Sequence, residues 1–406
     1  MPRLPSRSRH GAVPTPAVPM TAARAALLAI AALAAPATAR AFDPLALEPE
    51  TVVQTEPNPS RGLRAELWSQ HFDWRDRPPD ASGRQQRVLL DLRREWRLNE
   101  HVRVGLSNRA ERVFVPGRDQ TRNALRELYA GIDAPHGGYL DIGRINWRNG
   151  VGSGFNPTDY LREGTVIEQG SQDPRALREN RLGTVMLRAQ RIGAAGSVQL
   201  ALIPSLASHT GSSPTAPGWS RSNPRRAALL KLSPTLDERT TIDVLGYARA
   251  GDRPRFGANL THLWNHSLVL HAEASTGRRV ADAPHPGAAP GVSRSGPDWV
   301  FGATWASPAG PVISTELQRD AAVDARALFV RVAWDRPLGL PETDIAAFVR
   351  HDLKDRGRLW QIDLAWHLDP RHSLKLLVGG HAGPRDSAHG AIPLRRHATL
   401  AWQRHF

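Results

Sequence analysis

Hydrophobic and polar residues alternate with a period of two along most of this chain. Segments of about ten residues with this alternation recur from Arg61 onward, and each is typical of a strand with one apolar face. The clearest apolar phases are Val88/Leu90/Leu92/Trp96, Val102/Val104/Leu106, Leu140/Ile142, Val185/Leu187/Ala189, Val198/Leu200/Leu202, Ile242/Val244/Ala248, Leu268/Leu270/Ala272, Trp299/Phe301/Ala303/Trp305, Leu328/Val330/Val332/Trp334, Ile345/Ala347/Val349, Trp360/Ile362/Leu364/Trp366 and Leu374/Leu376/Val378. Weaker candidates lie near residues 61–73, 123–134, 226–233, 255–264 and 310–319. With a last strand, the pattern predicts an all-β chain of about eighteen strands, in a range of roughly 16–18.

The last nine residues form a strand with an aromatic residue at its end. The apolar positions are Ala398, Leu400, Trp402 and Phe406, and the polar positions are Thr399, Gln403 and His405. Such a strand resembles the terminal strand of bacterial outer-membrane barrels, which the barrel-assembly machinery reads as a signal. The resemblance implies that Phe406 is the assembly signal, and that outer-membrane lipid and the assembly machinery are partners.

The connections between the predicted strands alternate in length. The short ones are residues 369–371, 336–341, 307–309, 265–266, 192–195, 135–137 and 99–100. The longer ones are residues 383–393, 352–356, 320–324, 277–297, 205–225, 148–179, 116–122 and 74–85. Membrane barrels have short periplasmic turns and longer external loops, whereas a soluble β-sandwich has no reason to put its long loops at one end. Residues 61–406 are therefore predicted to form a transmembrane antiparallel up-and-down β-barrel.

The positions of the tryptophans also indicate that the short connections lie on the periplasmic side of a membrane. Six of them occupy the apolar phase close to a short connection or to the end of the last strand: Trp96, Trp264, Trp305, Trp334, Trp366 and Trp402. Indole rings prefer the boundary between hydrocarbon and water, so these residues are predicted to form a membrane girdle. The alternative is that they are core tryptophans of a soluble sandwich.

The beginning of the chain predicts export. Arg24 precedes an apolar run over residues 25–35, and two small-x-small sites follow it, which is typical of a secretory signal peptide. We expect a signal peptide over residues 1–41, with residues 1–19 as a possible N-terminal extension if Met20 is the true start, and a periplasmic lead-in over residues 42–60. The alternative for the apolar run is a buried alanine-rich helix. The expected location is the outer membrane of a Gram-negative bacterium.

Composition narrows the choice of function. The chain has no cysteine, which excludes a disulfide framework, a cysteine metal site and a cysteine nucleophile. The net charge is +14, but the arginines are scattered among acids without a basic helix, so nucleic acid is not an expected partner. His367 and His372 flank a turn at Asp369 and are not expected to share a metal. No catalytic residue, metal ligand or cofactor is predicted.

The polar phase of the same strands is rich in charge. It carries Asp91, Arg93, Glu95, Arg103, Arg109, Arg188, Asp243, Arg249, His271, Glu273, Arg331, Arg350, Asp363 and Lys375. Ionisable groups of both signs facing inward favour a water-filled interior. Basic groups outnumber acids, which predicts a mild preference for anions, with Arg103, Arg188, Arg331, Arg350 and Lys375 as pore-lining candidates. The alternative is a wall of salt bridges that only stiffens the barrel.

Residues 143–162 are the most individual segment. Gly143-Arg144 is followed by Trp147, by three glycines and by Asn156-Pro157-Thr158-Asp159. Because no amphipathic helix follows the glycines, a phosphate-binding loop is not expected. Over about residues 138–165, the sequence resembles alginate-export-type and related porin-like outer-membrane barrels. The resemblance implies a loop that folds into the pore and narrows it, with Arg148, Asp159 and Arg162 lining the constriction.

The preferred interpretation is an outer-membrane porin-like channel for small or oligomeric polar solutes. One alternative is a scaffold or export partner that binds polysaccharide or lipid without an open pore. A barrel-embedded hydrolase is the other, but no nucleophile and base can be paired from sequence because such partners meet only in space. The sequence leaves the solute and the oligomeric state open.

Overall fold

The computed structural model of the chain describes residues 62–75, 82–167, 170–207, 218–277 and 296–406. The signal peptide expected over residues 1–41 and the lead-in expected over residues 42–60 lie outside these residues. Among the described helices, none is long and apolar enough to cross a membrane.

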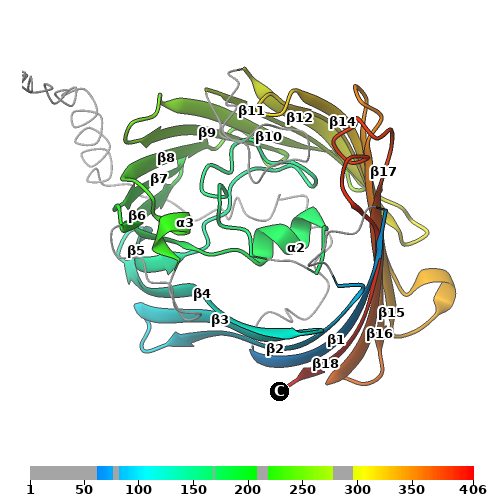
Figure 1. The fold of residues 1–406 in the computed structure, drawn as a ribbon. Helices are drawn as coiled ribbons and strands as arrows, with labels where there is room; N and C mark the ends of the chain where they lie inside the picture. The colour runs from blue at the N-terminus through cyan, green and yellow to red at the C-terminus, as the bar shows by residue number, and fades with distance from the viewer. Residues whose placement is uncertain (1–61, 76–81, 168–169, 208–217, 278–295) are drawn as a thin grey trace, which may run out of the picture. The chain divides into compact units, whose positions relative to one another are not determined.

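Eighteen strands of the described residues form one closed antiparallel sheet (Figure 1). Each strand pairs with its neighbours in sequence, and β1 pairs with β18 from Arg64 opposite His405 to Trp74 opposite Leu394, which closes the barrel. The strands are β1 (Gly62–Trp74), β2 (Arg84–Arg97), β3 (Val102–Val115), β4 (Arg118–Ala134), β5 (Gly138–Ile145), β6 (Thr184–Gly193), β7 (Gly196–Ile203), β8 (Ala227–Pro234), β9 (Thr240–Arg249), β10 (Arg255–Asn265), β11 (Leu268–Thr276), β12 (Asp298–Ala306), β13 (Val312–Asp320), β14 (Ala325–Asp335), β15 (Thr343–Asp352), β16 (Arg358–His367), β17 (His372–Ala382) and β18 (Leu394–His405). The predicted fold class and strand number are confirmed.

The outward face of the barrel is apolar. Leu90, Ile142 and Phe301 are 49%, 57% and 55% exposed, and each lies in the phase predicted to face lipid. A soluble sandwich would bury these side chains in its core, whereas a membrane barrel presents them to hydrocarbon. The period-two pattern therefore becomes an outward apolar surface because the sheet closes on itself and buries the polar phase.

The connections separate into two sets, one at each end of the barrel. At one end the strands are joined by short turns, of which residues 336–342 are the longest and contain the 3-10 helix η4 (Pro337–Gly339). At the other end lie the long connections over residues 146–183 and 204–226, which contain the helices α2 (Pro174–Glu179) and α3 (Trp219–Ser222). We call these the short-turn end and the long-loop end.

One predicted loop is wrong. Residues 116–122 were expected to form a moderate loop, but β3 and β4 extend to Val115 and Arg118, so that only Pro116 and Gly117 form the turn. Gly117 has a φ of 84°, which a glycine adopts readily, and Phe114 pairs with Asp119 in the extended ladder. Polar residues continue a strand wherever their backbone N–H and C=O groups have partners. The polar residues 118–122 are therefore part of β4, although their lack of apolar alternation had suggested a loop.

The six predicted girdle tryptophans lie on the outward face near the short-turn end. Trp96, Trp264, Trp305 and Trp366 are exposed, and Trp334 and Trp402 are half-buried. Phe406 is also exposed, its backbone N–H donates to Leu63 O at 2.9 Å, and the Arg404 guanidinium lies over its ring at 4.8 Å. The roles of these residues at a membrane boundary and in assembly stay predictions.

Candidate functional site

Residues 146–183 connect β5 to β6 and fold into the ring of strands instead of away from it; we call them the lumen segment. Figure 1 shows α2, which belongs to this segment, inside the ring. Three kinds of contact hold the lumen segment to the inner face of the barrel: an apolar cluster, two buried carboxylates and a group of arginines. Each kind comes from a different part of the barrel wall.

The apolar cluster joins the lumen segment to β5–β9. Its buried members are Ile145, Trp147, Tyr160, Leu161, Met186, Ala201, Ile203, Leu229, Leu245 and Tyr247. Tyr160 stacks on Tyr247 with ring centroids 5.2 Å apart, and its hydroxyl lies 3.1 Å from Ser275 Oγ. Burial raises the pKa of Tyr160 above its ordinary value, so its hydroxyl stays neutral. This part of the interior is a packed core and not a wet surface.

Glu273 of β11 binds the glycine-rich part of the lumen segment. Its carboxylate accepts hydrogen bonds from Val151 N at 2.9 Å, Gly152 N at 3.2 Å, Thr158 N at 2.6 Å and Thr158 Oγ1 at 2.8 Å. The residue is 1% exposed. A buried carboxylate without such donors would be costly, so Glu273 and the segment stabilise each other.

Glu316 of β13 repeats this arrangement two strands away. It accepts hydrogen bonds from Ser153 N and from Gly154 N, the latter at 3.0 Å. His271 Nε2 lies 3.0 Å from Oε1, the oxygen that also accepts from Ser153, and Gln318 Nε2 donates to Oε2 at 2.8 Å. Two wall carboxylates therefore hold consecutive backbone N–H groups of one turn, as anion-binding turns do with a free anion.

The glycines of the lumen segment are required by these close approaches. A β-carbon on Gly150, which has a φ of 94°, would lie 2.7 Å from both carboxylate oxygens of Glu273. A β-carbon on Gly154 would lie 2.5 Å from Gln318 Nε2 and 2.6 Å from Phe329 Cγ. The Gly-Val-Gly-Ser-Gly sequence therefore lets the backbone reach the wall, which a larger side chain would prevent.

Asp159 and Arg181 tie the two ends of the lumen segment together. Arg181 Nη1 donates to Asp159 Oδ2 at 2.8 Å, Nε to Asn146 Oδ1 at 2.5 Å and Nη2 to Trp147 O at 2.9 Å. Both charged side chains are buried, and burial lowers the pKa of Arg181 against the opposing effect of the Asp159 carboxylate. Asp159, expected to line the constriction, thus faces an arginine of its own segment instead of open water.

The end of α2 contacts the arginines of β2 and β4. Asn180 Oδ1 accepts from Arg93 Nη2 at 3.1 Å and from Arg126 Nη1 at 2.8 Å. Arg126 also donates to both carboxylate oxygens of Asp91. A bidentate arginine–aspartate pair is among the strongest neutralising contacts available in a buried site. Here the pair lies within the barrel wall, and Arg126 Nη1, which donates to Asp91, also donates to Asn180 of the segment.

Arg103 and Arg188 share the carboxylate of Asp141. Arg103 Nη2 lies 2.6 Å from Asp141 Oδ1, Arg103 Nη1 lies 2.6 Å from Asp133 Oδ1, and Arg188 Nη2 lies 2.5 Å from Asp141 Oδ2. These side chains connect β3, β4, β5 and β6 in one row. Both arginines keep part of their surface exposed, so the row stiffens the wall and also presents basic groups to the interior.

The remaining predicted candidates lie in different surroundings. Arg331 Nη2 lies 3.4 Å from Asp173 Oδ2 of the lumen segment, and Arg350 Nε donates to Gln318 Oε1 at 3.3 Å. Arg148 and Lys375 are exposed, and Arg162 is half-buried. The candidates are therefore distributed around the interior and do not form one ring.

Several residues of the site were not among the predicted candidates, and Arg126, Arg181 and Glu316 illustrate why. Glu316 lies on β13, which the pattern predicted only weakly, although its inward phase next to Gln318 could have identified it. Arg126 is displaced by a bulge, since Ser107 pairs with Glu127 and Asn108 with Leu125. Arg181 belongs to a connection without periodicity, so no pattern could have identified it.

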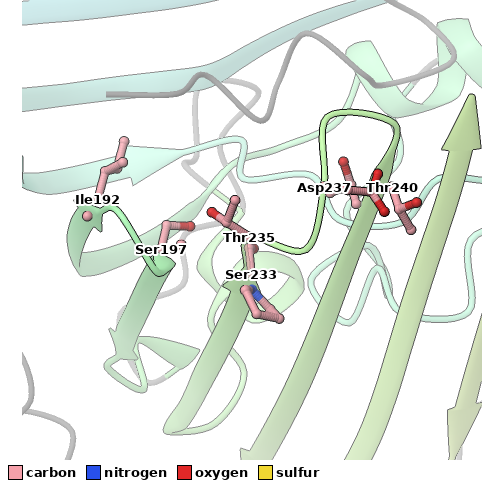
Figure 2. A pocket seen from close by; sticks show the side chains of 10 residues that line it. Ile192, Ser197, Ser233, Thr235, Asp237 and Thr240 are labelled. Carbon is pink, nitrogen blue, oxygen red and sulfur yellow. The ribbon is translucent and has the colours of Figure 1, made fainter. Parts of the chain in front are cut away.

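A separate small hollow lies at the short-turn end. Figure 2 shows Ile192, Ser197, Ser233, Thr235, Asp237 and Thr240 around it. The backbone N–H of Arg239 donates to Asp237 at 2.7 Å and lowers the pKa of that carboxyl. The hollow is lined by residues of the turns, of which Ser233 Oγ donates to Asp243 and Thr240 Oγ1 lies 3.0 Å from His262 Nδ1, so it is a feature of the turns.

Solved structures share the fold. The crystal structure of OpdQ from Pseudomonas aeruginosa matches 85% of this chain and 98% of its own, with a TM-score of 0.51 and 10% identity. The crystal structure of a BenF-like porin from Pseudomonas fluorescens Pf-5 matches 84% of this chain and 97% of its own, with a TM-score of 0.51 and 11% identity. At these identities the likeness shows the fold alone. No protein-family model and no curated protein matches, so the narrower alginate-export-type resemblance is not shown.

Proposed function

We propose that this protein is a porin-like channel in the outer membrane of a Gram-negative bacterium and that it passes small polar solutes. The observation that carries the proposal is a closed barrel with an apolar outward face and a charged inner face, narrowed by a lumen segment that is anchored to its wall. The shared fold with a Pseudomonas structure described as a porin supports it. The charged groups of the interior bind and orient solutes, and we assign them no catalytic role.

The solutes are expected to be preferentially anionic. The best-buried carboxylates of the inner face are already engaged: Glu273 and Glu316 by the lumen segment, and Asp91 and Asp141 by arginines. Among the predicted pore-lining groups, Arg148 and Lys375 stay exposed, and several arginines are partly so. The charge that a passing solute meets is therefore mainly positive, which favours anions mildly.

The experiment that tests conduction is a planar-bilayer recording of the purified, folded protein. We expect discrete conductance steps. If folded protein, verified by its heat-modifiable mobility in gels, leaves the bilayer silent, the channel proposal is wrong.

The anion preference has its own measurement. In a gradient of potassium chloride, the reversal potential is expected to show a mild preference for chloride. Replacing Arg148 and Arg162 by alanine should reduce it, because both belong to the lumen segment. If the reversal potential does not change, Arg148 and Arg162 do not line the narrowest part of the pore.

A second candidate function is a scaffold or export partner that binds polysaccharide without conducting. It is favoured by how widely the lumen segment contacts the wall: a β-carbon on Gly170 would lie 1.9 Å from the Trp68 ring on β1, and Gln361 Oε1 on β16 accepts from Gln172 N at 2.7 Å. The resemblance of residues 138–165 to alginate-export-type barrels points to an acidic polysaccharide. A silent bilayer together with binding of alginate oligomers would select this candidate.

A further inference from the structure

Basic side chains gather on one part of the outward face at the long-loop end. Arg319 of β13 and Arg326 of β14 are direct cross-strand partners. Burial alternates along both strands, and it places the two arginines in the same phase as the exposed Leu317 and Leu328. Both guanidinium groups therefore point away from the interior and toward the surroundings of the barrel.

The next two strands continue this surface. His351 of β15 and Arg358 of β16 are cross-strand partners, and Arg358 Nε donates to His351 Nδ1 at 3.4 Å. We call Arg319, Arg326, His351 and Arg358 the basic arc. It covers four adjacent strands, β13 to β16, so a molecule bound to one member can reach the others.

The arrangement of Arg319 and Arg326 lacks a compensating charge. Like charges directly opposite each other on neighbouring strands destabilise a sheet. Asp324, in the connection between the two strands, is paired with Lys354. Within the part of the chain that the structure describes, neither arginine side chain has an acidic partner. The pair is therefore a place where an external anion would stabilise the folded protein.

The basic arc lies where the apolar surface ends. Leu317 and Leu328, two residues along from the arginines, are 42% and 38% exposed. Two residues of a strand span about 7 Å, so the guanidinium groups lie within one headgroup depth of the hydrocarbon-facing surface. Arginine suits this level because its stem packs on apolar atoms while its charged end reaches the polar layer.

On the other side of the barrel, the outward positions nearest the long-loop end of the strands are uncharged. The outward positions near the long-loop ends of β6 to β10 are Val185, Leu202, Ala228, Ala248 and Phe256, all without charge. Exposed cations do occur elsewhere at this end, as Arg112 of β3, Arg396 of β18 and Arg226 before β8, but Arg112 is paired with Asp119 at 2.9 Å and Arg396 lies opposite Asp73. What distinguishes the basic arc is that its members are cross-strand partners on adjacent strands, which fits an anionic occupant with more than one contact point.

We propose that the basic arc binds the phosphate groups of a phosphorylated glycolipid in the outer leaflet. Guanidinium groups bind phosphate oxygens in a bidentate manner, and two adjacent strands place the two guanidinium groups close enough to share one phosphate or to bind two on one headgroup. The position beside the apolar surface commits the site to a lipid headgroup instead of free phosphate. The proposal rests on the membrane placement given above, but it does not require that the barrel conducts.

Binding of bisphosphorylated lipid A to the folded protein in detergent, measured by native mass spectrometry, tests the proposal. The double variant Arg319→Ala/Arg326→Ala should bind about ten- to thirtyfold more weakly, since each arginine near an anionic headgroup contributes about one factor of five. Arg358→Ala should weaken binding less. The matched control is Arg239→Ala/Arg371→Ala, which removes two exposed arginines from the short-turn end and should leave the affinity unchanged.

Three outcomes would overturn the proposal. One is equal binding by the wild type and the double variant. Another is equal binding of dephosphorylated lipid A by the wild type, which would assign the affinity to the apolar surface alone. A third is a lower oligomeric state of the double variant without any dependence on phosphate, which would make the basic arc a contact between copies of this chain. A silent bilayer would affect only the proposed channel function, because lipid binding is measured without conduction.

Discussion

Two parts of the inner wall use carboxylates in different ways. On β11 and β13, Glu273 and Glu316 accept backbone N–H groups of the lumen segment, and in the described residues neither has an arginine or lysine partner. On β2 and β5, Asp91 and Asp141 accept from arginines of other strands, Arg126 of β4 and Arg188 of β6. We call these the glutamate wall and the arginine wall.

The difference shows which part of the barrel depends on the lumen segment. Charge on the arginine wall is balanced mainly within the wall, so this part would stay neutralised without the segment. The glutamate wall is balanced by donors that the segment supplies, so removing either one leaves buried polar groups unsatisfied. Changes to the glutamate wall should therefore alter the width of the pore, and changes to the arginine wall should alter the field inside it.

The largest effect is expected for Glu273→Ala. The change leaves at least three buried N–H and O–H donors without an acceptor, at about 1–3 kcal/mol each, so the segment should leave the glutamate wall. Single-channel conductance should then rise, with roughly a doubling expected for a less restricted pore. The control Glu100→Ala removes a carboxylate from an exposed turn. If conductance stays at the wild-type level, the apolar cluster alone holds the segment.

The next largest effect is expected when an ion pair within the lumen segment is broken, in comparison with an ion pair within the arginine wall. Asp159→Asn leaves Arg181 buried without a countercharge, which costs about 3–5 kcal/mol. We expect a lower unfolding temperature and faster proteolysis within residues 146–183. The matched change Asp133→Asn on the arginine wall should have little effect, because Arg103 keeps Asp141 at 2.6 Å. Equal effects of the two changes would show that the walls do not differ in this respect.

A smaller effect is expected for Gly150→Ala. The added β-carbon would lie 2.7 Å from both carboxylate oxygens of Glu273, so the turn must shift although its acceptor is still present. Conductance should increase, but less than in Glu273→Ala. Gly83→Ala is the control, because its nearest neighbouring atom is 3.9 Å away. A Gly150→Ala channel identical to the wild type would mean that the segment adjusts without leaving the wall.

The smallest effect should come from Lys375→Ala. This lysine is in the inward phase of β17 and is exposed, so its removal should shift the reversal potential slightly toward cations. The unfolding temperature should not change, since exposed charges contribute little to stability. Lys354→Ala, in a connection at the long-loop end, is the control and should not change the reversal potential. A larger shift from Lys354 than from Lys375 would place the selective charge outside the barrel.

Several features of the fold could be predicted because they depend on local pattern. Leu90, Ile142 and Phe301 were assigned to the outward phase from their spacing alone, and they are exposed there. The connections that were identified were assigned to the correct ends of the barrel, except that residues 118–122 belong to β4, and the connections over residues 235–239 and 250–254 were not identified. The error arose because polarity was taken to end a strand, whereas paired backbone groups continue it.

The candidate site was harder to predict for two physical reasons. A bulge opposite Ser107 places Arg126 beside Asp91, and a period-two count cannot detect one extra residue. Asp159 was expected to line the pore, but its partner Arg181 lies in a connection without any periodicity. Inward charges such as Glu273 were also taken as a sign of a wet interior, yet this carboxylate is buried under the lumen segment.

The sequence by itself determined the strands, their phase, the apolar outward face and the position of the lumen segment between β5 and β6. These depend on spacing, on turn residues and on the chemistry of each side chain, all of which are local. Only the tertiary structure decided which inward charges meet each other and which meet the segment. Glu273 and Val151 are 122 residues apart, and they come together only because the sheet closes and the segment crosses its interior. An inward carboxylate can be hydrated, paired with an arginine or hydrogen-bonded to backbone N–H groups. Which of these occurs depends on the group that the closed barrel places opposite it.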